Sequence, residues 1–90
     1  MRTPCYTRRF RQDLKLAQKR RKDIDKLKEV IAALTEDRPL DEKRKDHPLK
    51  GKFAEYRECH IESDWLLVYK KPRSSEIVFV RMGTHSDLFG

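Results

Sequence analysis

The stretch YRECHIESDWLLVYK, residues 56–70, decides the fold of this chain. It is rich in aromatic and β-branched residues, which favour strands. It is broken once, at Ser63-Asp64, which is short enough for a tight antiparallel turn. We therefore expect one strand at Phe53–Ile61 and a second at Trp65–Lys70.

A third strand is predicted at Glu76–Met82, which has a similar composition. The break before it, Pro72-Arg73-Ser74-Ser75, is short enough for an antiparallel meander with Trp65–Lys70 in its centre. The segment Met1–Tyr6 is the candidate for a fourth strand. The tail Gly83–Gly90 is so short that we expect only a turn or a final bridge there.

The N-terminal third of the chain predicts two helices. The segment Phe10–Leu34 contains neither Gly nor Pro, and its apolar residues recur at helical spacing. They form two groups that point about a quarter-turn or more apart, separated by the basic run Lys19–Lys22. We expect Thr7 and Asp23 to cap the two helices, and Asp37-Arg38-Pro39 to end the second one.

Together these elements predict an α+β fold with a single domain over residues 1–90. Ninety residues leave room for one core only. A helical hairpin packed on one face of a small antiparallel sheet would bury the apolar side of both layers. The opposite face of the sheet is then free, and the polar segment 37–52 is expected to be a surface loop that carries function.

The composition favours a polyanionic partner. The chain has 22 Lys and Arg against 15 Asp and Glu, which gives a net charge of +7. Such a surface attracts polyanions, but charge alone leaves RNA, DNA, the ribosome, an anionic membrane and an acidic protein open. The basic runs Lys19–Lys22 and Lys43–Lys45 are expected on solvated faces that would position an RNA backbone without catalysing.

The cysteine content and the hydropathy indicate a cytoplasmic protein. Cys5 and Cys59 are too few and too far apart for a disulfide framework, so we expect two reduced thiols. Residues 1–10 contain no apolar secretory core, and no segment approaches the roughly 20 apolar residues of a membrane span. We therefore expect a soluble protein with no membrane partner.

Three histidines are the candidates for chemistry. His47 falls in the loop before the sheet, His60 at the end of the first strand and His85 in the tail. Histidine accepts and donates a proton near neutral pH, so an acid and a base on either side of one phosphodiester is a natural use of such residues. Scattered histidines are also common as ordinary surface residues, and their spacing alone leaves both readings open.

Other chemistries fit the sequence poorly. The histidines lack the paired spacing of zinc ligands. Cys59 points to the face of its strand opposite His60, so it is expected in the core and not as a nucleophile. The chain has no Gly-rich phosphate loop and no nucleophile elbow. We expect neither a metal nor a cofactor.

Four further residues border the histidines in the sequence. Asp64 and Trp65 lie at the turn into the central strand. There they either form the turn and anchor the core, or orient a histidine and stack on a base. Arg57 and Arg81 lie in otherwise apolar strands, where a guanidinium must meet an anion, an acidic partner or water. A phosphate of the substrate is one such anion.

Three motifs, KDHPL at 45–49, YRECHIESDWLLVY at 56–69 and GTHSDLFG at 83–90, carry a family resemblance. They resemble the YafQ-like branch of the RelE toxin superfamily, and the segment KLAQKR at 15–20 also looks like that branch. The resemblance implies the RelE-like microbial ribonuclease fold. It further implies a ribosome-dependent, metal-independent endoribonuclease that cleaves translated mRNA and so inhibits translation. A cognate acidic antitoxin would silence it, and only the complex of the two would bind DNA.

The resemblance also implies roles for individual residues. The catalytic positions of the family correspond to four residues here, namely His47, His60, His85 and the acidic member Asp64. Arg81 would support the phosphate and Phe89 would close the site. Trp65 occupies an aromatic position beside them.

The expected mechanism follows from the 2′-hydroxyl of RNA. One histidine would deprotonate this hydroxyl, which attacks the adjacent phosphorus, while another protonates the departing 5′-oxygen. We expect His85 to be the acid because it lies next to Arg81, and His47 or His60, together with Asp64, to be the base. The products would be a 2′,3′-cyclic phosphate and a 5′-hydroxyl.

The alternative is a non-catalytic RNA- or ribosome-binding module. It would use the same basic surface, with Trp65 stacking on bases, and it predicts binding without cleavage. If the chain is a toxin, we expect acidic antitoxin residues to cover His60, Arg81 and His85.

Overall fold

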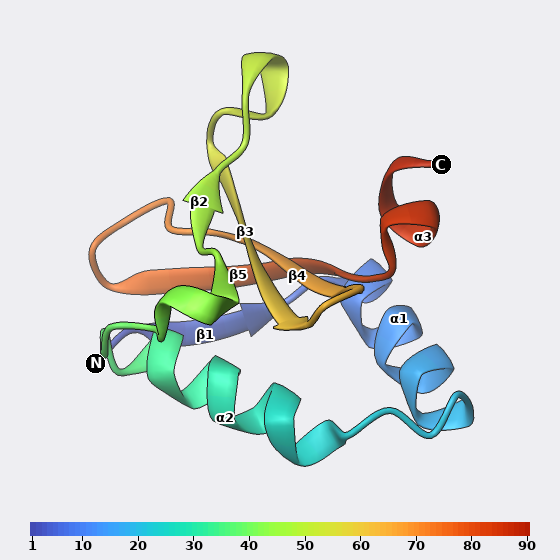
Figure 1. The fold of residues 1–90 in the computed structure, drawn as a ribbon. Helices are drawn as coiled ribbons and strands as arrows, with labels where there is room; N and C mark the ends of the chain where they lie inside the picture. Colours follow the sequence, from blue (N-terminus) through green and yellow to red (C-terminus); the bar gives the residue numbers. More distant parts are fainter.

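Five strands form one sheet in the order β1-β5-β4-β3-β2 (Figure 1). The computed structural model describes all 90 residues. The strands are β1 (Thr3–Tyr6), β2 (His47–Pro48), β3 (Tyr56–Glu62), β4 (Trp65–Lys70) and β5 (Glu76–Gly83). The antiparallel β3-β4-β5 meander and the central position of β4 confirm the prediction from residues 56–70.

The sheet is mixed, which corrects the prediction of a wholly antiparallel sheet. Strand β1 pairs with β5 in parallel, with Thr3 opposite Glu76 and Tyr6 opposite Phe79. Two strands so far apart in the sequence are joined by most of the chain, including both long helices, and such a crossover permits parallel pairing. Strand β3 begins at Tyr56 and not at Phe53, because Gly51–Phe53 forms a short 3₁₀ turn, η2.

The predicted helical hairpin is present as α1 (Arg8–Lys19) and α2 (Ile24–Thr35), which lie together on one side of the sheet (Figure 1). Thr7 Oγ1 accepts the N–H of Phe10 at 3.0 Å, and Asp23 Oδ1 accepts the N–H of Lys26 at 3.3 Å. These bonds satisfy backbone donors that the first turn of a helix leaves free. Both predicted caps are confirmed.

The core lies between the helices and the inner face of the sheet. Its largest side chains are fully buried and come mainly from the strands: Trp65, Tyr69, Phe79, Ile61, Leu67, Ile77, Met82 and, from α2, Leu27 and Val30. Cys59 is also fully buried in this layer, and burial raises the pKa of its thiol to about 12. This confirms Cys59 as a small core residue. No helix has the length and apolarity needed to cross a membrane.

Two segments outside the core have more structure than predicted. The loop 37–52 contains a 3₁₀ turn, η1 (Glu42–Arg44), followed by β2 at the sheet edge. The tail, expected to be a turn or bridge, forms the helix α3 (His85–Phe89). Thr84 Oγ1 accepts the N–H of Asp87 at 3.1 Å and Asp87 Oδ2 accepts the N–H of Thr84 at 3.0 Å. This capping box explains why so short a helix forms.

Candidate active site

The sheet brings His60 and His85 together on its free face. His60 on β3 is opposite Leu66 on β4, which is opposite Gly83 on β5, and α3 begins two residues later at His85. The centroids of the two imidazole rings are 6.0 Å apart, and the rings meet edge to face at 63°. Two of the three predicted histidines therefore form a pair.

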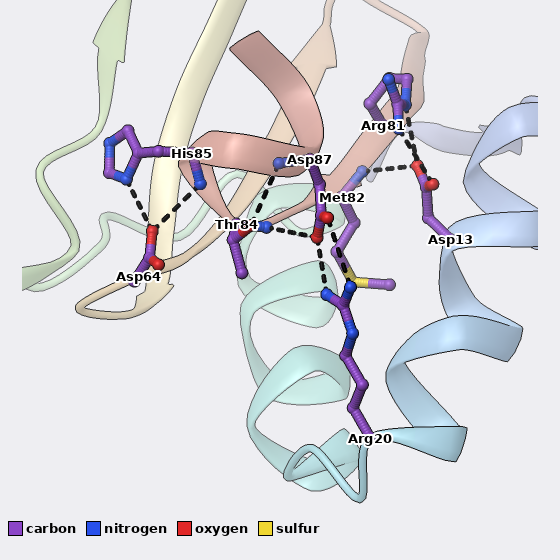
Figure 2. Close-up of polar contacts among 8 residues, drawn as sticks. All are labelled: Asp13, Arg20, Asp64, Arg81, Met82, Thr84, His85 and Asp87. Atoms are coloured by element: carbon purple, nitrogen blue, oxygen red, sulfur yellow. Dashed lines mark hydrogen bonds and ion pairs between the residues drawn. The ribbon is translucent and has the colours of Figure 1, made fainter. Parts of the chain in front are cut away.

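Asp64 binds His85 from the turn between β3 and β4 (Figure 2). Its Oδ1 accepts the backbone N–H of His85 at 3.0 Å and the ring Nδ1–H at 2.7 Å. Both hydrogen bonds lower the pKa of the Asp64 carboxyl, and the bond from the backbone N–H has the larger effect. We expected Asp64 to assist a base, His47 or His60. The structure corrects this pairing: the turn between β3 and β4 lies next to the start of α3, so Asp64 contacts His85.

All three histidines present the same ring nitrogen. In each ring Nδ1 lies against an oxygen that only accepts hydrogen bonds, so Nδ1 carries the proton and Nε2 is left for chemistry. The pairs are His47 with the Lys45 carbonyl (2.6 Å), His60 with the Ser63 carbonyl (3.3 Å) and His85 with Asp64 (2.7 Å). The accepting oxygens belong to the turn at Lys45 and to the turn Ser63-Asp64, so these two turns set the tautomers of the histidines.

His47 lies on the same face of the sheet as His60, at the edge. It is opposite Glu58 in the antiparallel β2-β3 ladder, and directly opposed residues share a face. Glu58 and His60 are two residues apart on β3 and so share that face as well. The structure therefore places all three histidines on the predicted free face, with His47 lying apart from the His60–His85 pair along the sheet.

Glu58 is a site residue that the sequence analysis missed. It is only 6% exposed, and its Oε1 lies 3.8 Å from Nε2 of His60. The signal that could have found it is a carboxylate within a strand, two residues before a histidine. Its position allows it to balance positive charge on His60.

Arg81 is held by an acidic partner from α1, which the sequence did not reveal. Its Nε and Nη2 donate to Asp13 at 3.0 and 3.1 Å, and Asp13 also accepts the N–H of Met82 at 3.0 Å (Figure 2). Because β1 ends at Tyr6, opposite Phe79, this part of β5 pairs only with β4, and the Asp13 carboxylate binds the backbone N–H that is left free on the β1 side. The hydrogen bonds with Asp13 raise the pKa of Arg81. Both bonds use Nε and Nη2, which leaves Nη1 for an anion.

A second contact from α1 holds the helix that carries His85. Arg20, just after α1, donates to both carboxylate oxygens of Asp87 at 2.7 and 3.3 Å (Figure 2). This lowers the pKa of Asp87 far below its ordinary range. A Cβ on Gly83 would lie 2.8 Å from the Cβ of Asp87, so only glycine permits this close approach. Helix α3 is thus fixed by Asp64 and Arg20 from two elements.

Two residues that we considered as substrate contacts, Trp65 and Arg57, lie away from the His60–His85 pair. Trp65 is 1% exposed and belongs to the core, which favours the core-anchor role over base stacking, the two roles that the sequence left open. Arg57 is opposite Tyr69, on the face covered by the core, and its Nε donates to Asp46 at 3.3 Å. The hydroxyl of Tyr69 also donates to Asp46, at 2.5 Å. Arg57 therefore anchors the residue before His47, on the opposite face to the histidines.

Phe89 lies on α3 with His85 and is 56% exposed. It lines a hollow of about 260 Å³ on the free face of the sheet. The other walls are mostly apolar and comprise Leu49, Phe53, Tyr56, Val68, Val80, Arg81 and Leu88. The position of Phe89 is compatible with closing the site, which stays a prediction. The hollow itself depends on distant segments and could not be read from the sequence.

The geometry gives no metal-binding group of the usual kind. No three His, Cys, Asp or Glu side chains converge to hold an ion. The cluster instead provides the elements of acid–base chemistry on a phosphodiester: imidazole Nε2 atoms, carboxylates that balance charge and an arginine. The expectation of metal independence stays a prediction.

Known proteins share the sequence and the fold of this chain. The family model of the bacterial toxin YafQ of type II toxin–antitoxin systems matches residues 2–90. The mRNA interferase toxin YafQ of Escherichia coli strain K12 is 45% identical over 86 residues, 94% of this chain and 92% of that protein.

Two solved structures are similarly close. The toxin in the crystal structure of the E. coli DinJ–YafQ toxin–antitoxin complex is 44% identical, with a TM-score of 0.91 over 99% of this chain and 98% of that chain. A metal-bound toxin from Helicobacter pylori is 42% identical, with a TM-score of 0.91 over 99% and 100% of the two chains.

The resemblance of the three motifs is therefore confirmed over almost the whole chain. The chain belongs to the YafQ family of bacterial toxins of type II toxin–antitoxin systems.

Proposed function

We propose that this chain is an mRNA interferase, an endoribonuclease that cleaves translated mRNA on the ribosome. The observation that carries the proposal is the pairing of His60 and His85, whose rings lie 6.0 Å apart with both Nε2 atoms unengaged by a hydrogen bond. Two such groups, on the sheet face that also carries Arg81, suit a reaction that removes one proton and delivers another. The name of the E. coli relative supports the same activity.

In the proposed reaction, a base removes the proton of the 2′-hydroxyl, and the oxygen attacks the adjacent phosphorus. The bond to the 5′-oxygen then breaks, and an acid protonates that oxygen as it leaves. The products are a 2′,3′-cyclic phosphate and a 5′-hydroxyl. No water is consumed in this step, so the proton taken by the base matches the one given by the acid.

We assign the acid to His85. Asp64 against Nδ1 holds the ring in one tautomer and balances the charge that the ring carries when Nε2 is also protonated. His60, with Glu58 3.8 Å from its Nε2, and His47 remain the two candidates for the base. Arg81, held by Asp13, would stabilise the phosphorane through its remaining N–H groups.

The role of His85 has a specific test. In an mRNA whose scissile 5′-oxygen is replaced by sulfur, the leaving thiolate needs no proton. His85→Gln should be strongly impaired on ordinary mRNA and should recover most of its rate on the sulfur-containing mRNA. An equal loss on both substrates would show that His85 is not the acid.

We further propose that an acidic antitoxin covers the cluster. The relative YafQ has been crystallised with DinJ, and the net charge of this chain is +7. An acidic segment that folds on binding would place carboxylates near Arg81 and the paired histidines. Protection of His60 and His85 from diethyl pyrocarbonate by the bound antitoxin would support this, and full reactivity in the complex would contradict it.

The alternative, a binding module without catalysis, is less well supported by the geometry. It relied on Trp65 as a stacking surface, and that ring is 1% exposed. One experiment distinguishes the two functions. It uses ribosomes programmed with an mRNA that carries a single 2′-deoxynucleotide at the cleavage site. An interferase should bind this complex and cut only the all-ribose control, whereas a binding module should cut neither.

A further inference from the structure

A second hollow, lined mainly by basic side chains, has His60 in its wall. It has a volume of about 420 Å³ and lies where the end of β3 meets η1 and the first turn of α2. Its lining is predominantly basic and comprises Lys26, Lys43, Arg44, Lys45, His60, Ile61, Glu62 and Ser63. We call this feature the basic hollow.

The basic hollow carries an excess of positive charge. Its one carboxylate, Glu62, accepts from Nζ of Lys26 at 3.1 Å and is thereby neutralised. Lys43 and Lys45 are exposed and form no ion pair with any carboxylate of the chain. Arg44 is half-buried and donates to the carbonyl of Ile61, which holds its guanidinium in the wall. Three cations therefore remain without a negative partner.

The wall of the basic hollow is ordered by the same turn that orients His47. Asp41 Oδ1 accepts the N–H of Lys43 at 3.1 Å and caps η1. Lys45 then adopts a left-handed conformation, with φ of +49°, which is uncommon for a residue other than glycine. This turn exposes the Lys45 carbonyl, which accepts Nδ1–H of His47 at 2.6 Å. One turn thus places two cations at the hollow and fixes a candidate catalytic ring.

We propose that the basic hollow binds the backbone phosphate next to the scissile one on the mRNA strand. The inference rests on the proposed function and adds a substrate subsite to it. His60 forms part of the wall, so a strand whose scissile phosphate lies at the His60–His85 pair has its neighbouring phosphate within reach of the hollow. Lysine ammonium groups are flexible point charges that suit the backbone of a splayed single strand.

The occupant is therefore a phosphodiester of the substrate and not of ribosomal RNA. A charge contact next to the reacting phosphate helps to place that phosphate between the acid and the base. A contact with ribosomal RNA would strengthen docking of the toxin on any ribosome, with or without mRNA. The two sources of phosphate thus predict different measurements.

The test uses ribosomes programmed with synthetic mRNAs in which one phosphate beside the scissile bond is replaced by a neutral methylphosphonate. For the wild type, one of the two flanking replacements should lower kcat/KM about tenfold, the effect of about one charge-assisted contact. The variant Lys43→Gln, Lys45→Gln should lose a similar factor on ordinary mRNA and be insensitive to that replacement. Lys15→Gln, Lys28→Gln makes the same charge change on exposed helical positions and should behave as the wild type.

Three results would overturn the inference. A lysine variant that keeps the wild-type kcat/KM and the wild-type sensitivity to methylphosphonate would show that the hollow does not bind the substrate. A weaker affinity of the lysine variant for ribosomes without mRNA would assign the hollow to ribosomal RNA. A wild type that binds programmed ribosomes and cuts none of the mRNAs would refute the proposed function itself, and this result is distinct from cleavage that ignores the replacements.

Discussion

One oxygen of Asp64 accepts two hydrogen bonds from His85, at 2.7 Å from the ring Nδ1–H and at 3.0 Å from the backbone N–H. The carboxylate therefore sets the ring and the start of α3 at once. It links the turn between β3 and β4 to a tail that follows it by about twenty residues. The acid–base account depends on this link.

Replacing Asp64 with asparagine should reduce catalysis without unfolding the protein. The amide keeps an acceptor for the backbone N–H but removes the negative charge beside the ring, and such a loss in acid–base catalysis is about 10²-fold. The Tm should change little because the pair is exposed. Single-turnover cleavage on ribosomes and thermal unfolding check both parts. An unchanged kcat would remove Asp64 from the mechanism.

Arg20→Ala should loosen α3 and lower kcat about tenfold, because a helix of five residues has little stability of its own. Arg20→Lys should be intermediate, since an ammonium cannot reproduce the two-point contact with Asp87. Hydrogen exchange of the α3 amides should accelerate in the same order. Arg11→Ala on the same helix is the control. Faster exchange without any loss of kcat would show that the contact is only structural.

Acid should destabilise the fold through Asp87. Its pKa is lowered in the folded state, so below its ordinary value of 3.8 the unfolded chain binds more protons than the native one. The stabilisation is thus present above about pH 3.8 and is lost as the pH falls toward the lowered folded value. Urea unfolding from pH 5 downward should show a shallower decline for Asp87→Asn than for the wild type. Parallel curves would contradict the assignment.

Trp65→Ala should act on stability and not on substrate binding. Removing a fully buried indole from the core should cost about 3–5 kcal/mol. Trp65→Phe keeps most of the volume and should cost less. For this milder variant, KM on ribosome-bound mRNA should match the wild type once the folded fraction is taken into account. A raised KM in a fully folded Trp65→Phe protein would restore a substrate role to the ring.

The local features of the fold were accessible from the sequence. The caps at Thr7 and Asp23, the helical spacing and the β4 segment Trp65–Lys70 all depend on residues near one another, and each is confirmed. The parallel pairing of β1 with β5 depends on contacts between opposite ends of the chain, so it was not predicted. Helix α3 has only five residues, too few for its apolar residues to show a helical period in the sequence.

The sequence indicated which residues form the candidate site more completely than it indicated the contacts between them. The partner of Asp64 depends on where the C-terminal tail packs against the sheet. The partner of Arg81, Asp13, is more than sixty residues away in the sequence. A shift of register between His60 and Glu62 accompanies the placement of Trp65 in the core. No spacing rule in the sequence shows such a shift, and so the role of that ring was left open.

The most direct test of the central claim is to map the ends of mRNA fragments produced on translating ribosomes. The wild type is compared with His60→Ala, His85→Ala, with and without a chelator that binds transition metals and leaves ribosomal magnesium in place. The account predicts 2′,3′-cyclic phosphate and 5′-hydroxyl ends, cleavage that resists the chelator, and none by the double variant when it is folded. Cleavage that the chelator abolishes, or that persists in the double variant, would contradict it.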